Sequence, residues 1–420
     1  MIYDIIIIGS GISGLNTAYK LLKEKKDLKI LILEKNDYIG GRIKTERINI
    51  NNHDYQFEEG AGRFNEKHKL LINLLYELHL KKNIIEIGAN IAFYPSTPYN
   101  KIFIHKSPFE YINKVIEYSK EDSEEELQKY NFIEYCKKVL KKDEIQFIVD
   151  SFGYYKQIKK MNTFNAIKLF NDGMNPNLKF FSLDCGLDMI IKNLAHKIEE
   201  YNSEILLNHY VNKVDYLETE KIFHVFTNKK TYYSKICILA IPKPDLLKFN
   251  ILKEYNNIIN SIGVKSLCRI YSIFRKKDIW FKDIGKSTTN SDSRYIIPID
   301  KKNGLIMISY SDSKFANYWY KLKKENEKLF LEKIKNNIYK AFHKKIKNPL
   351  YINAYYWKTG TGYWLKNKDS RELSKKIICP NKNIPLFICG ENYSETQGWM
   401  EGALETSNIV VIKLKKYFLL

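Results

Sequence analysis

The chain has 420 residues, of which 44% are hydrophobic and 14% aromatic, so it can bury a large core, and a disordered protein is excluded. A chain of this length is expected to form two domains. Its longest apolar runs have the length of strands, and no transmembrane helix is predicted. The N-terminus lacks the basic segment and cleavage site of a signal peptide, so we expect a cytoplasmic protein without a membrane anchor.

The formal net charge is +21, and six cysteines are scattered along the chain. Such a charge is typical of proteins that bind nucleic acid or anionic membranes. The lysines, however, are spread over the whole sequence, which favours a solvated basic surface and no nucleic-acid partner. An attraction for anionic substrates stays open. The cysteines form no C-x-x-C pair, which indicates reduced thiols and neither a disulfide framework nor a metal site.

The N-terminal residues carry the pattern of a dinucleotide-binding βαβ unit. Residues 5–8 form an apolar run typical of a buried parallel strand, and Gly9, Gly11 and Gly14 follow directly before an amphipathic stretch at 15–22. Gly9 would allow the tight turn, Gly11 the close approach of a pyrophosphate, and Gly14 the close packing of helix on strand. The helix N-terminus would then face the phosphates.

An acid and a guanidinium follow the second apolar run, at residues 30–33. Glu34 lies where a carboxylate accepts hydrogen bonds from a ribose, which argues against a 2′-phosphate. Gly40, Gly41 and Arg42 form a turn whose guanidinium suits a second contact to the pyrophosphate. A surface turn with a solvated arginine is the alternative.

The rest of the chain suggests a nucleotide-binding domain that is interrupted twice. Residues 81–203 show helical periodicity, and residues 265–375 alternate strands with a long charged helix around 321–343. The predicted fold class is α/β, with a Rossmann-like domain that is assembled from three segments and an inserted α+β substrate domain. The three segments are 1–80, 204–264 and 376–420, and the inserted domain comprises 81–203 and 265–375.

The C-terminal motif identifies a family. Gly390 and Glu391 follow an apolar run, and residues 398–403 read G-W-M-E-G-A at the start of a helix, which would bring a second helix N-terminus to the cofactor. With the N-terminal glycines, Glu34 and the turn at 40–42, this pattern resembles the flavin-containing amine oxidase superfamily. Within it, stretches at 60–68, 181–187 and 285–294 are most similar to L-amino-acid oxidases.

The resemblance implies an FAD cofactor. The FAD is expected to be noncovalent, because no cysteine precedes Tyr363, where some amine oxidases attach their flavin. Val211 would contact the adenine, Glu391 the ribitol or pyrophosphate, and the Met400 N–H the flavin pyrimidine carbonyl. The implied cofactor contacts are Gly9, Gly11, Ile12, Ser13, Gly14, Glu34, Lys35, Gly41, Arg42, Gly60, Ala61, Gly62, Arg63, Val211, Gly390, Glu391, Gly398, Trp399 and Met400.

The resemblance also implies a substrate site. Arg63 matches the arginine that binds the substrate α-carboxylate, a bidentate task suited to guanidinium; a phosphate contact or a structural salt bridge are its alternatives. Tyr363 and Trp399 match two rings that sandwich the amine carbon in front of the flavin. A core position is the alternative for Tyr363. The predicted substrate-binding residues are therefore Arg63, Tyr363 and Trp399.

Three departures from the family pattern stand out. Arg269 occupies the place of a lysine that is bridged by water to flavin N5, with Lys265 as the alternative occupant. An arginine keeps its charge and cannot readily act as a base. The tyrosine that assists carboxylate binding is missing near Ile296, and Cys185 replaces a glycine. The predicted catalytic residues are Arg269, Tyr363 and Trp399.

These features predict an FAD-dependent oxidase of an L-amino acid or amine. Hydride would pass from the substrate C–H to flavin N5, the imine would hydrolyse, and oxygen would be reduced to hydrogen peroxide. Only one G-x-G-x-x-G is present, so no nicotinamide site is expected. The alternatives are a polyamine or monoamine oxidase, a carotenoid- or porphyrinogen-oxidising relative, and a flavin-binding protein with impaired catalysis. The expected partners are the small-molecule substrate and oxygen; no oligomeric state is inferred.

Overall fold

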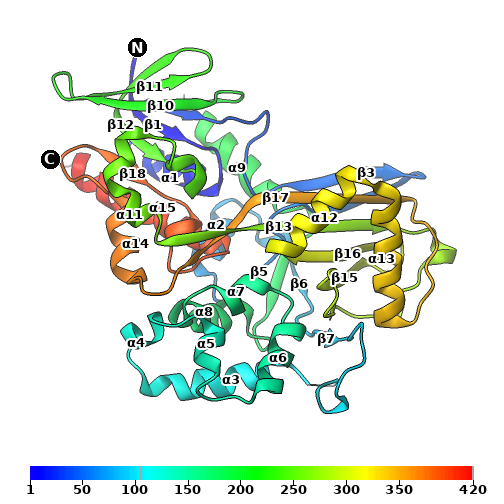
Figure 1. Ribbon diagram of the computed structural model, residues 1–420. Helices are drawn as coiled ribbons and strands as arrows, with labels where there is room; N and C mark the ends of the chain where they lie inside the picture. The colour runs from blue at the N-terminus through cyan, green and yellow to red at the C-terminus, as the bar shows by residue number, and fades with distance from the viewer. Residues whose placement is uncertain (105, 202, 419–420) are drawn as a thin grey trace.

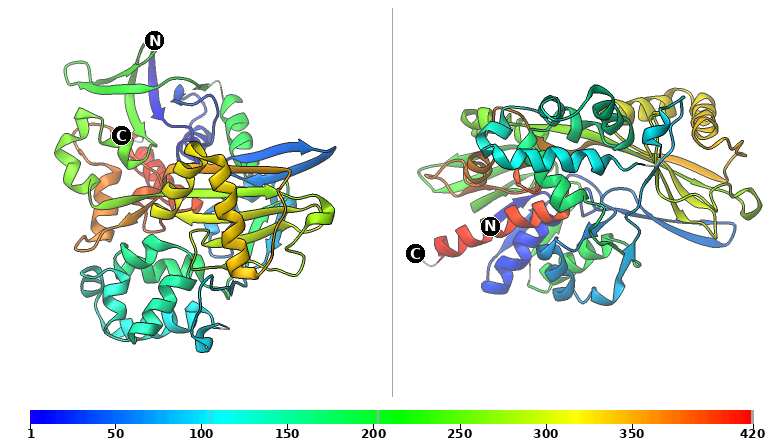
Figure 2. Two further views of the ribbon diagram at one scale, coloured as in Figure 1. Left: turned by 45° about the vertical axis from the view of Figure 1, so that its right-hand side comes forward. Right: turned by 90° about the horizontal axis from the view of Figure 1, so that it is seen from below.

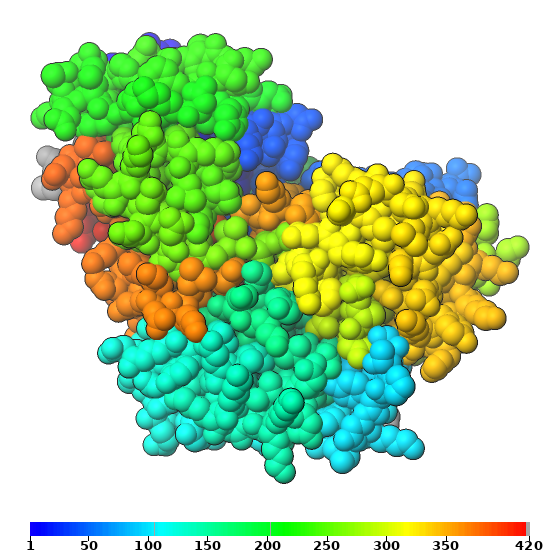
Figure 3. Space-filling model, in the orientation of Figure 1, coloured from blue at the N-terminus to red at the C-terminus, as the bar shows by residue number. Residues whose placement is uncertain are grey.

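A computed structural model describes residues 1–104, 106–201 and 203–418 (Figure 1). Two main β-sheets and a lobe of short helices make up the chain. One sheet lies near both termini, the second lies beside it, and the helical lobe lies below both (Figures 1 and 2). In Figure 3 the helical lobe, coloured cyan to teal, packs below the yellow helices that cover the second sheet.

The first sheet has the N-terminal strand at its centre. Its order is β10-β11-β12-β1-β2-β9, with β18 paired to β12. β1 runs parallel to both β2 and β12, because the connections between them cross over the sheet, whereas β10, β11 and β12 form an antiparallel meander. The strands are β1 (Ile2–Ile8), β2 (Ile30–Leu33), β9 (Glu204–Leu206), β10 (Val211–Leu217), β11 (Ile222–Thr227), β12 (Thr231–Leu239) and β18 (Leu386–Ile388).

Isoleucine and leucine fill the central strands on both faces, since helices cover this sheet. Every residue of β2 is buried, as are residues 5–8 of β1. Helix α1 (Ile12–Glu24) contacts both α9 (Asp188–Glu199) and α15 (Met400–Phe418). The first sheet thus joins chain segments that are far apart in sequence. Shorter helices around it are α2 (Lys69–Glu77), α10 (Lys243–Leu246), α11 (Asn256–Ile259) and α14 (Ser370–Ile378).

The second sheet has the order β17-β13-β16-β15-β14-β7. Ile262 of β13 and Trp364 of β17 also pack in the core of the first sheet. Helices α12 (Ser313–Glu325) and α13 (Glu327–Phe342) cover one face around a core that includes Trp319 and Phe330. The hairpin of β3 (Thr45–Ile50) and β4 (His53–Glu58) packs against strands β13 and β16 of this sheet. The strands are β7 (Ala92–Phe93), β13 (Ile262–Ile273), β14 (Ser287–Thr288), β15 (Tyr295–Asp300), β16 (Leu305–Asp312) and β17 (Tyr351–Trp364).

The helical lobe has an aromatic core of its own, in which Phe132, Phe147 and Phe170 are fully buried. A small sheet of order β5-β8-β6 connects this lobe to the N-terminal segment. The lobe's helices are α3 (Pro108–Tyr118), α4 (Glu124–Gln128), α5 (Phe132–Cys136), α6 (Lys142–Ser151), α7 (Tyr155–Lys159) and α8 (Thr163–Leu169). The small sheet consists of β5 (Phe64–Asn65), β6 (Ile84–Ile87) and β8 (Phe180–Leu183).

The α/β class is confirmed, and the first sheet takes strands from three separated segments, as predicted. Other details differ. Helix α9 packs in the core of the first sheet through Ile190 and Leu194, although residues 81–203 were assigned to the inserted domain. The helix predicted around 321–343 is two helices, because Asn326 ends α12 and its side chain caps α13 by accepting from the Leu329 N–H.

The predicted domain boundaries stay an interpretation, since a periodic segment indicates a helix but not the sheet that the helix covers. Within the described residues, no helix combines the length and apolarity needed to cross a bilayer.

Candidate active site

A cavity of about 1210 Å³ lies where the strands of the first sheet end, between that sheet, the second sheet and the helical lobe. Ordinary ligand pockets measure about 300–1,000 Å³, so this cavity has room for a dinucleotide and a small substrate. All but two of the predicted site residues line it. The exceptions are Gly14, which lies directly beneath the glycine loop, and Tyr363.

The three glycines of the N-terminal loop have the distinct tasks that their spacing predicts. Gly9 has φ +105°, and a Cβ there would lie 2.6 Å from the Ala240 carbonyl oxygen. At Gly14 a Cβ would lie 2.1 Å from the Gly9 oxygen, so only glycine lets α1 pack this closely on β1. At Gly11 a Cβ would meet nothing within 4 Å, because this residue borders the open cavity. The N-terminus of α1 has no side-chain cap, which leaves its N–H groups for a ligand.

Glu34, at the end of β2, is part of the loop as well as of the cavity wall. Its Oε2 accepts from the Ser10 N–H at 2.9 Å and from the Ser10 hydroxyl at 2.8 Å, and its Oε1 accepts from the Asn36 N–H at 3.0 Å. The sequence did not reveal this link. Because a carboxylate has about four acceptor sites, Glu34 can hold the loop and still accept from a ribose. Val211 lines the cavity nearby.

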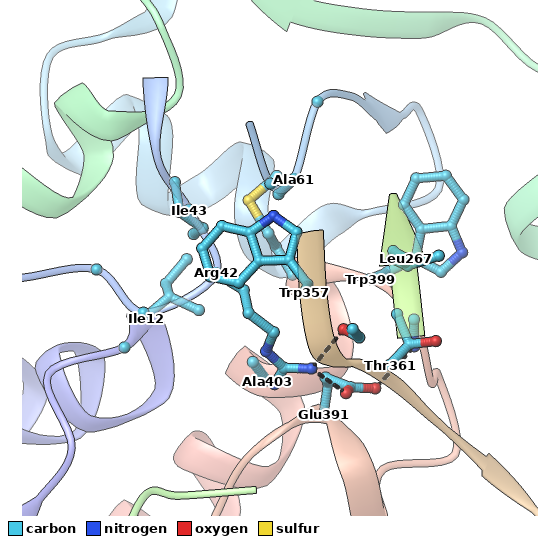
Figure 4. A pocket seen from close by; sticks show the side chains of 18 of the residues that line it. Ile12, Arg42, Ile43, Ala61, Leu267, Trp357, Thr361, Glu391, Trp399 and Ala403 are labelled. Atoms are coloured by element: carbon cyan, nitrogen blue, oxygen red, sulfur yellow. Dashed lines mark hydrogen bonds and ion pairs between the residues drawn. The ribbon is translucent and has the colours of Figure 1, made fainter. Parts of the chain in front are cut away.

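The predicted turn at 40–42 is tied to two segments from the last quarter of the chain. Arg42 donates through Nη1 to the Gly360 carbonyl at 2.8 Å and to Glu391 Oε1 at 2.5 Å (Figure 4). Glu391 Oε2 accepts in turn from the Gly398 N–H at 2.9 Å. In the described chain Nη2 of Arg42 has no protein partner, which leaves it for the predicted phosphate contact. Lys35, by contrast, pairs with Asp245 at 3.0 Å at the cavity edge.

The segment at 60–62 lies against this turn with little space to spare. A Cβ at Gly60 would lie 1.9 Å from the Arg42 carbonyl oxygen, and Ala61 donates its N–H to the same oxygen at 2.9 Å. A Cβ at Gly62 would lie 2.9 Å from Arg269 Nη1. The glycines therefore let the backbone pass between the predicted FAD site and the predicted catalytic arginine.

The C-terminal motif brings a second helix N-terminus to the cavity. Gly398 has φ +84°, α15 begins at Met400, and both residues line the cavity. Glu401 turns the other way, since its carboxylate accepts from the N–H groups of Leu70 and Leu71 at 2.8 and 2.9 Å. The motif thus presents backbone N–H groups and a partial positive charge to the cavity and not an acid.

Trp399 lies at the far end of the cavity from the glycine loop. Its ring packs edge-on against His68 at 4.7 Å, and burial, with the charge of Arg63, lowers the pKa of His68 to about 3. His68 is therefore neutral at physiological pH. The Trp399 Nε1 is buried and, among the described residues, has no protein acceptor.

Arg63 lies beside Trp399. Its guanidinium carbon is 4.3 Å from the centre of the Phe180 ring and 5.8 Å from that of the Trp399 ring. No acidic side chain pairs with Arg63 anywhere in residues 1–104, 106–201 or 203–418. Of the roles predicted for this residue, a structural salt bridge is therefore absent from the described chain, and the guanidinium faces the cavity with its donors free.

Arg269 and Lys265 both point from β13 into the cavity but have different neighbours. Arg269 donates through Nη1 to the Glu58 carbonyl at 2.7 Å and lies over the Tyr310 ring at 4.7 Å. Burial opposes its charge, but neighbouring tyrosines raise the pKa of Arg269 above its usual value. Lys265 pairs instead with buried Asp312 at 3.5 Å. Arg269 is thus the cation next to the 60–62 segment, and Lys265 is neutralised.

Tyr363 is not where the resemblance places it. The ring packs over Gly263, where a Cβ would lie 2.1 Å from Cζ, and the hydroxyl accepts from Lys156 of α7 at 3.2 Å. Thr361, two residues earlier on β17, still reaches the cavity, whereas Tyr363 lies past its end under the helical lobe. The alternative reading of Tyr363 as a core residue therefore matches the structure. Trp357, six residues earlier on the same strand, lines the cavity instead (Figure 4).

Sequence reasoning missed several residues of the substrate end. Trp357 donates through Nε1 to the Glu59 carbonyl at 2.8 Å, which fixes its ring. Tyr154 reaches the cavity from the helical lobe and Tyr310 from β16. Lys286 lies in the stretch at 285–294 that resembles L-amino-acid oxidases, but the sequence did not indicate that its side chain lines the cavity. Nothing in the sequence singled out Tyr154.

The residues present fit an FAD molecule. The open side of Gly11 and the uncapped start of α1 form a cradle for phosphates. At the other end the buried hydroxyl of Thr361, which has no protein partner in the described chain, faces the cavity below Trp357 (Figure 4). A polar ligand that spans this length would satisfy both ends.

The fold and this cavity define an FAD-binding protein of two sheets and a helical lobe. The chain belongs to the flavin-containing amine oxidoreductase family, whose model matches residues 12–411. A probable flavin-containing monoamine oxidase A of Dictyostelium discoideum is 34% identical over 130 residues, which cover 29% of this chain and 27% of that relative. The match therefore spans about a quarter of the relative's length.

Solved structures of low identity share the fold. Wild-type putrescine oxidase bound to putrescine superposes with a TM-score of 0.77 at 15% identity, over 99% of both chains. A putative protoporphyrinogen oxidase from Exiguobacterium sp. 255-15 superposes with a TM-score of 0.73, also at 15% identity over 99% of both chains. At this identity the likeness shows the fold alone. The specific resemblance to L-amino-acid oxidases stays a prediction.

Proposed function

We propose that the protein oxidises a primary amine that carries a carboxylate, an L-amino acid, with FAD as the cofactor and oxygen as the final acceptor. The observation that carries this proposal is Arg63, whose guanidinium faces the cavity between Phe180 and Trp399 without an acidic partner in the described chain. A partly buried cation gains most from a ligand that supplies the anion. A carboxylate does so in bidentate geometry.

The charges of the cavity support an amino acid over a diamine. Lys265, Arg269 and Lys286 line the same end as Arg63, and of these Lys265 has an acidic partner. The second ammonium of a diamine would meet like charges in a site of low dielectric, which costs binding energy. An amino acid brings a carboxylate that offsets part of this field.

A bound FAD would supply the redox chemistry, which is acceptance of a hydride from the substrate C–H and transfer of the electrons to oxygen. The protein's residues supply position and charge. Trp357 and Trp399 would flank the amine, and the N-terminus of α15 would stabilise negative charge at the end of the cavity. Arg269 stays protonated, because its tyrosine neighbours raise its pKa, so it provides positive charge and not a base.

The FAD would be held noncovalently. Cys389 is the one cysteine among the residues that line the described cavity, and its Sγ lies 3.9 Å from the Thr17 hydroxyl, under the glycine loop. Burial raises the pKa of this thiol to about 12, so it is a poor nucleophile.

A substrate panel tests the proposal. Purified holoprotein is incubated with L-amino acids, their D-enantiomers and the corresponding decarboxylated amines, and peroxide is measured by a peroxidase-coupled dye. We expect peroxide from L-amino acids and far less from the amines. Turnover of the amines alone would make the protein a monoamine or polyamine oxidase. A bound flavin that no compound of the panel reduces would make it a flavin-binding protein without this activity.

A further inference from the structure

Lys286 is a further basic side chain at the substrate end of the cavity, and backbone hydrogen bonds fix its position in the chain. It directly precedes β14, which pairs with β15 and with β7. Its carbonyl accepts from the Ala92 N–H at 3.1 Å, and the hydroxyl of the next residue, Ser287, donates to the Gly285 carbonyl at 2.8 Å. The side chain extends from this anchored turn into the cavity wall, half-buried.

No acid neutralises Lys286 within the described parts of the chain. Burial lowers its pKa well below the usual lysine value, and the nearby charge of Arg63 lowers it further. Lys265 provides a contrast in the same cavity, because its ammonium pairs with the buried carboxylate of Asp312. The fold thus pairs Lys265 with an acid and leaves Lys286 without an acidic partner in the described chain.

The acids of the cavity wall have other partners. Glu34 accepts from Ser10, and Glu391 from Arg42. The carboxylate of Glu58 points away toward α9, where it accepts from the Leu187 N–H at 2.9 Å. Asp245 pairs with Lys35 and Lys248, and Asp184 accepts from Asn83. None of them is available to Lys286.

Aromatic rings line the cavity together with Arg63 and Lys286. Arg63, Tyr154, Tyr295 and Lys286 all line the cavity, and the charge of Arg63 influences the pKa of each of the other three. The Tyr295 hydroxyl donates to the Phe152 carbonyl at 2.6 Å, which leaves the ring as an apolar wall. Two basic side chains beside an apolar wall suit a ligand with two anionic groups on a short aliphatic chain.

We propose that Lys286 binds a second, distal carboxylate, so that the preferred substrates are acidic L-amino acids whose α-carboxylate lies on Arg63. The proposal rests on the function proposed above. The geometry that carries it is that Arg63, at the end of the 60–63 segment, and Lys286, directly before β14, line the same cavity and have no acidic partner in the described chain. Binding of the second carboxylate would also stabilise the charged form of Lys286.

The test uses holoprotein and two non-oxidisable probes, glutarate and butyrate, which differ by one carboxylate. Their binding is measured by calorimetry and by the change of the visible flavin spectrum. We expect glutarate to bind roughly tenfold or more tightly than butyrate, and Lys286→Met to remove this preference while butyrate binding changes little. Lys286→Arg should keep part of it.

Lys358→Met is the matched control, because Lys358 lines the same cavity but is exposed. This variant loses the same charge and should keep the preference for glutarate. Equal binding of the two probes by the unaltered protein, or an equal loss in both variants, would overturn the role of Lys286. Thermal unfolding of each holoprotein establishes that the variants are folded.

Turnover separates this inference from the proposed function. L-glutamate should be oxidised faster than L-glutamine at low concentration, and Lys286→Met should equalise them. Equal rates for both substrates that Lys286→Met leaves unchanged would contradict the inference and leave an amino-acid oxidase. A Lys286-dependent preference for glutarate without oxidation of any amino acid would support the anion site and refute the oxidase.

Discussion

Arg42 and Glu391 form an ion pair across 349 positions of the sequence, with Nη1 and Oε1 2.5 Å apart. The pair joins the turn after the glycine loop to the motif that precedes α15. Glu391 is nearly buried, with 6% of its side chain exposed, and it also accepts from the Gly398 N–H. One carboxylate therefore joins the turn at 40–42 to the start of the C-terminal motif.

Replacing Arg42 tests this role. Arg42→Met leaves the Glu391 carboxylate without its cation, so we expect a loss of about 2 kcal/mol in the free energy of unfolding. FAD should also dissociate more readily, since the turn would no longer be tied to the C-terminal motif. Urea unfolding of the apoprotein and titration with FAD measure the two effects. Unchanged FAD affinity would show that the pair is structural only.

Two glycines of the same loop should respond in opposite ways to alanine. Gly14→Ala forces a Cβ to 2.1 Å from the Gly9 oxygen, and we expect a loss of about 2–3 kcal/mol in stability. Gly11→Ala meets no atom within 4 Å and should leave the apoprotein stable, but its methyl group stands where the pyrophosphate would lie. FAD titration of a stable Gly11→Ala protein should show weaker binding. Normal FAD affinity there would place the phosphates elsewhere.

Glu58 should make the stability depend on pH. Burial raises its pKa from 4.5 to about 7, although hydrogen bonds from Leu187 and Thr45 oppose the shift. Because the folded pKa lies above the unfolded one, its contribution is fully present below about pH 4.5 and is lost as the pH rises to about 7. Glu58→Gln removes this titration and should gain about 2 kcal/mol relative to the unaltered protein between pH 5 and 8. The free energy of unfolding of both proteins is measured in urea as a function of pH. A difference between them that does not change with pH would contradict the raised pKa of Glu58.

Tyr363 and Trp399 should differ sharply on substitution. Tyr363→Phe removes the hydrogen bond with Lys156 outside the cavity, so we expect a stability loss of about 1 kcal/mol and kcat/KM within about twofold. Trp399→Phe changes a ring in the cavity wall and should lower kcat/KM by roughly tenfold or more. Steady-state kinetics on the best substrate compare them. A larger loss of kcat/KM in Tyr363→Phe than in Trp399→Phe would instead support the role beside the flavin that the family resemblance implies for Tyr363.

The sequence predicted local features well and long-range placement less well. The glycine loop, Glu34 and the start of α15 are encoded within a few residues each, so spacing was enough to find them. The side to which α9 packs, the partner of Arg42 and the end of the cavity before Tyr363 depend on how separated segments meet. Trp357 and Tyr154 carry no local motif, and their roles arise only when β17 and the helical lobe close the cavity.

The most direct test of the central claim is the anaerobic reduction of the bound flavin, followed at its visible absorbance. An L-amino acid is compared with the amine formed by its decarboxylation, in the unaltered protein and in Arg63→Met. We expect the amino acid to reduce the flavin much faster, and Arg63→Met to lower this preference roughly 100-fold through weaker binding of the amino acid. Equal effects of Arg63→Met on both compounds would contradict the assignment of Arg63 as the carboxylate-binding residue.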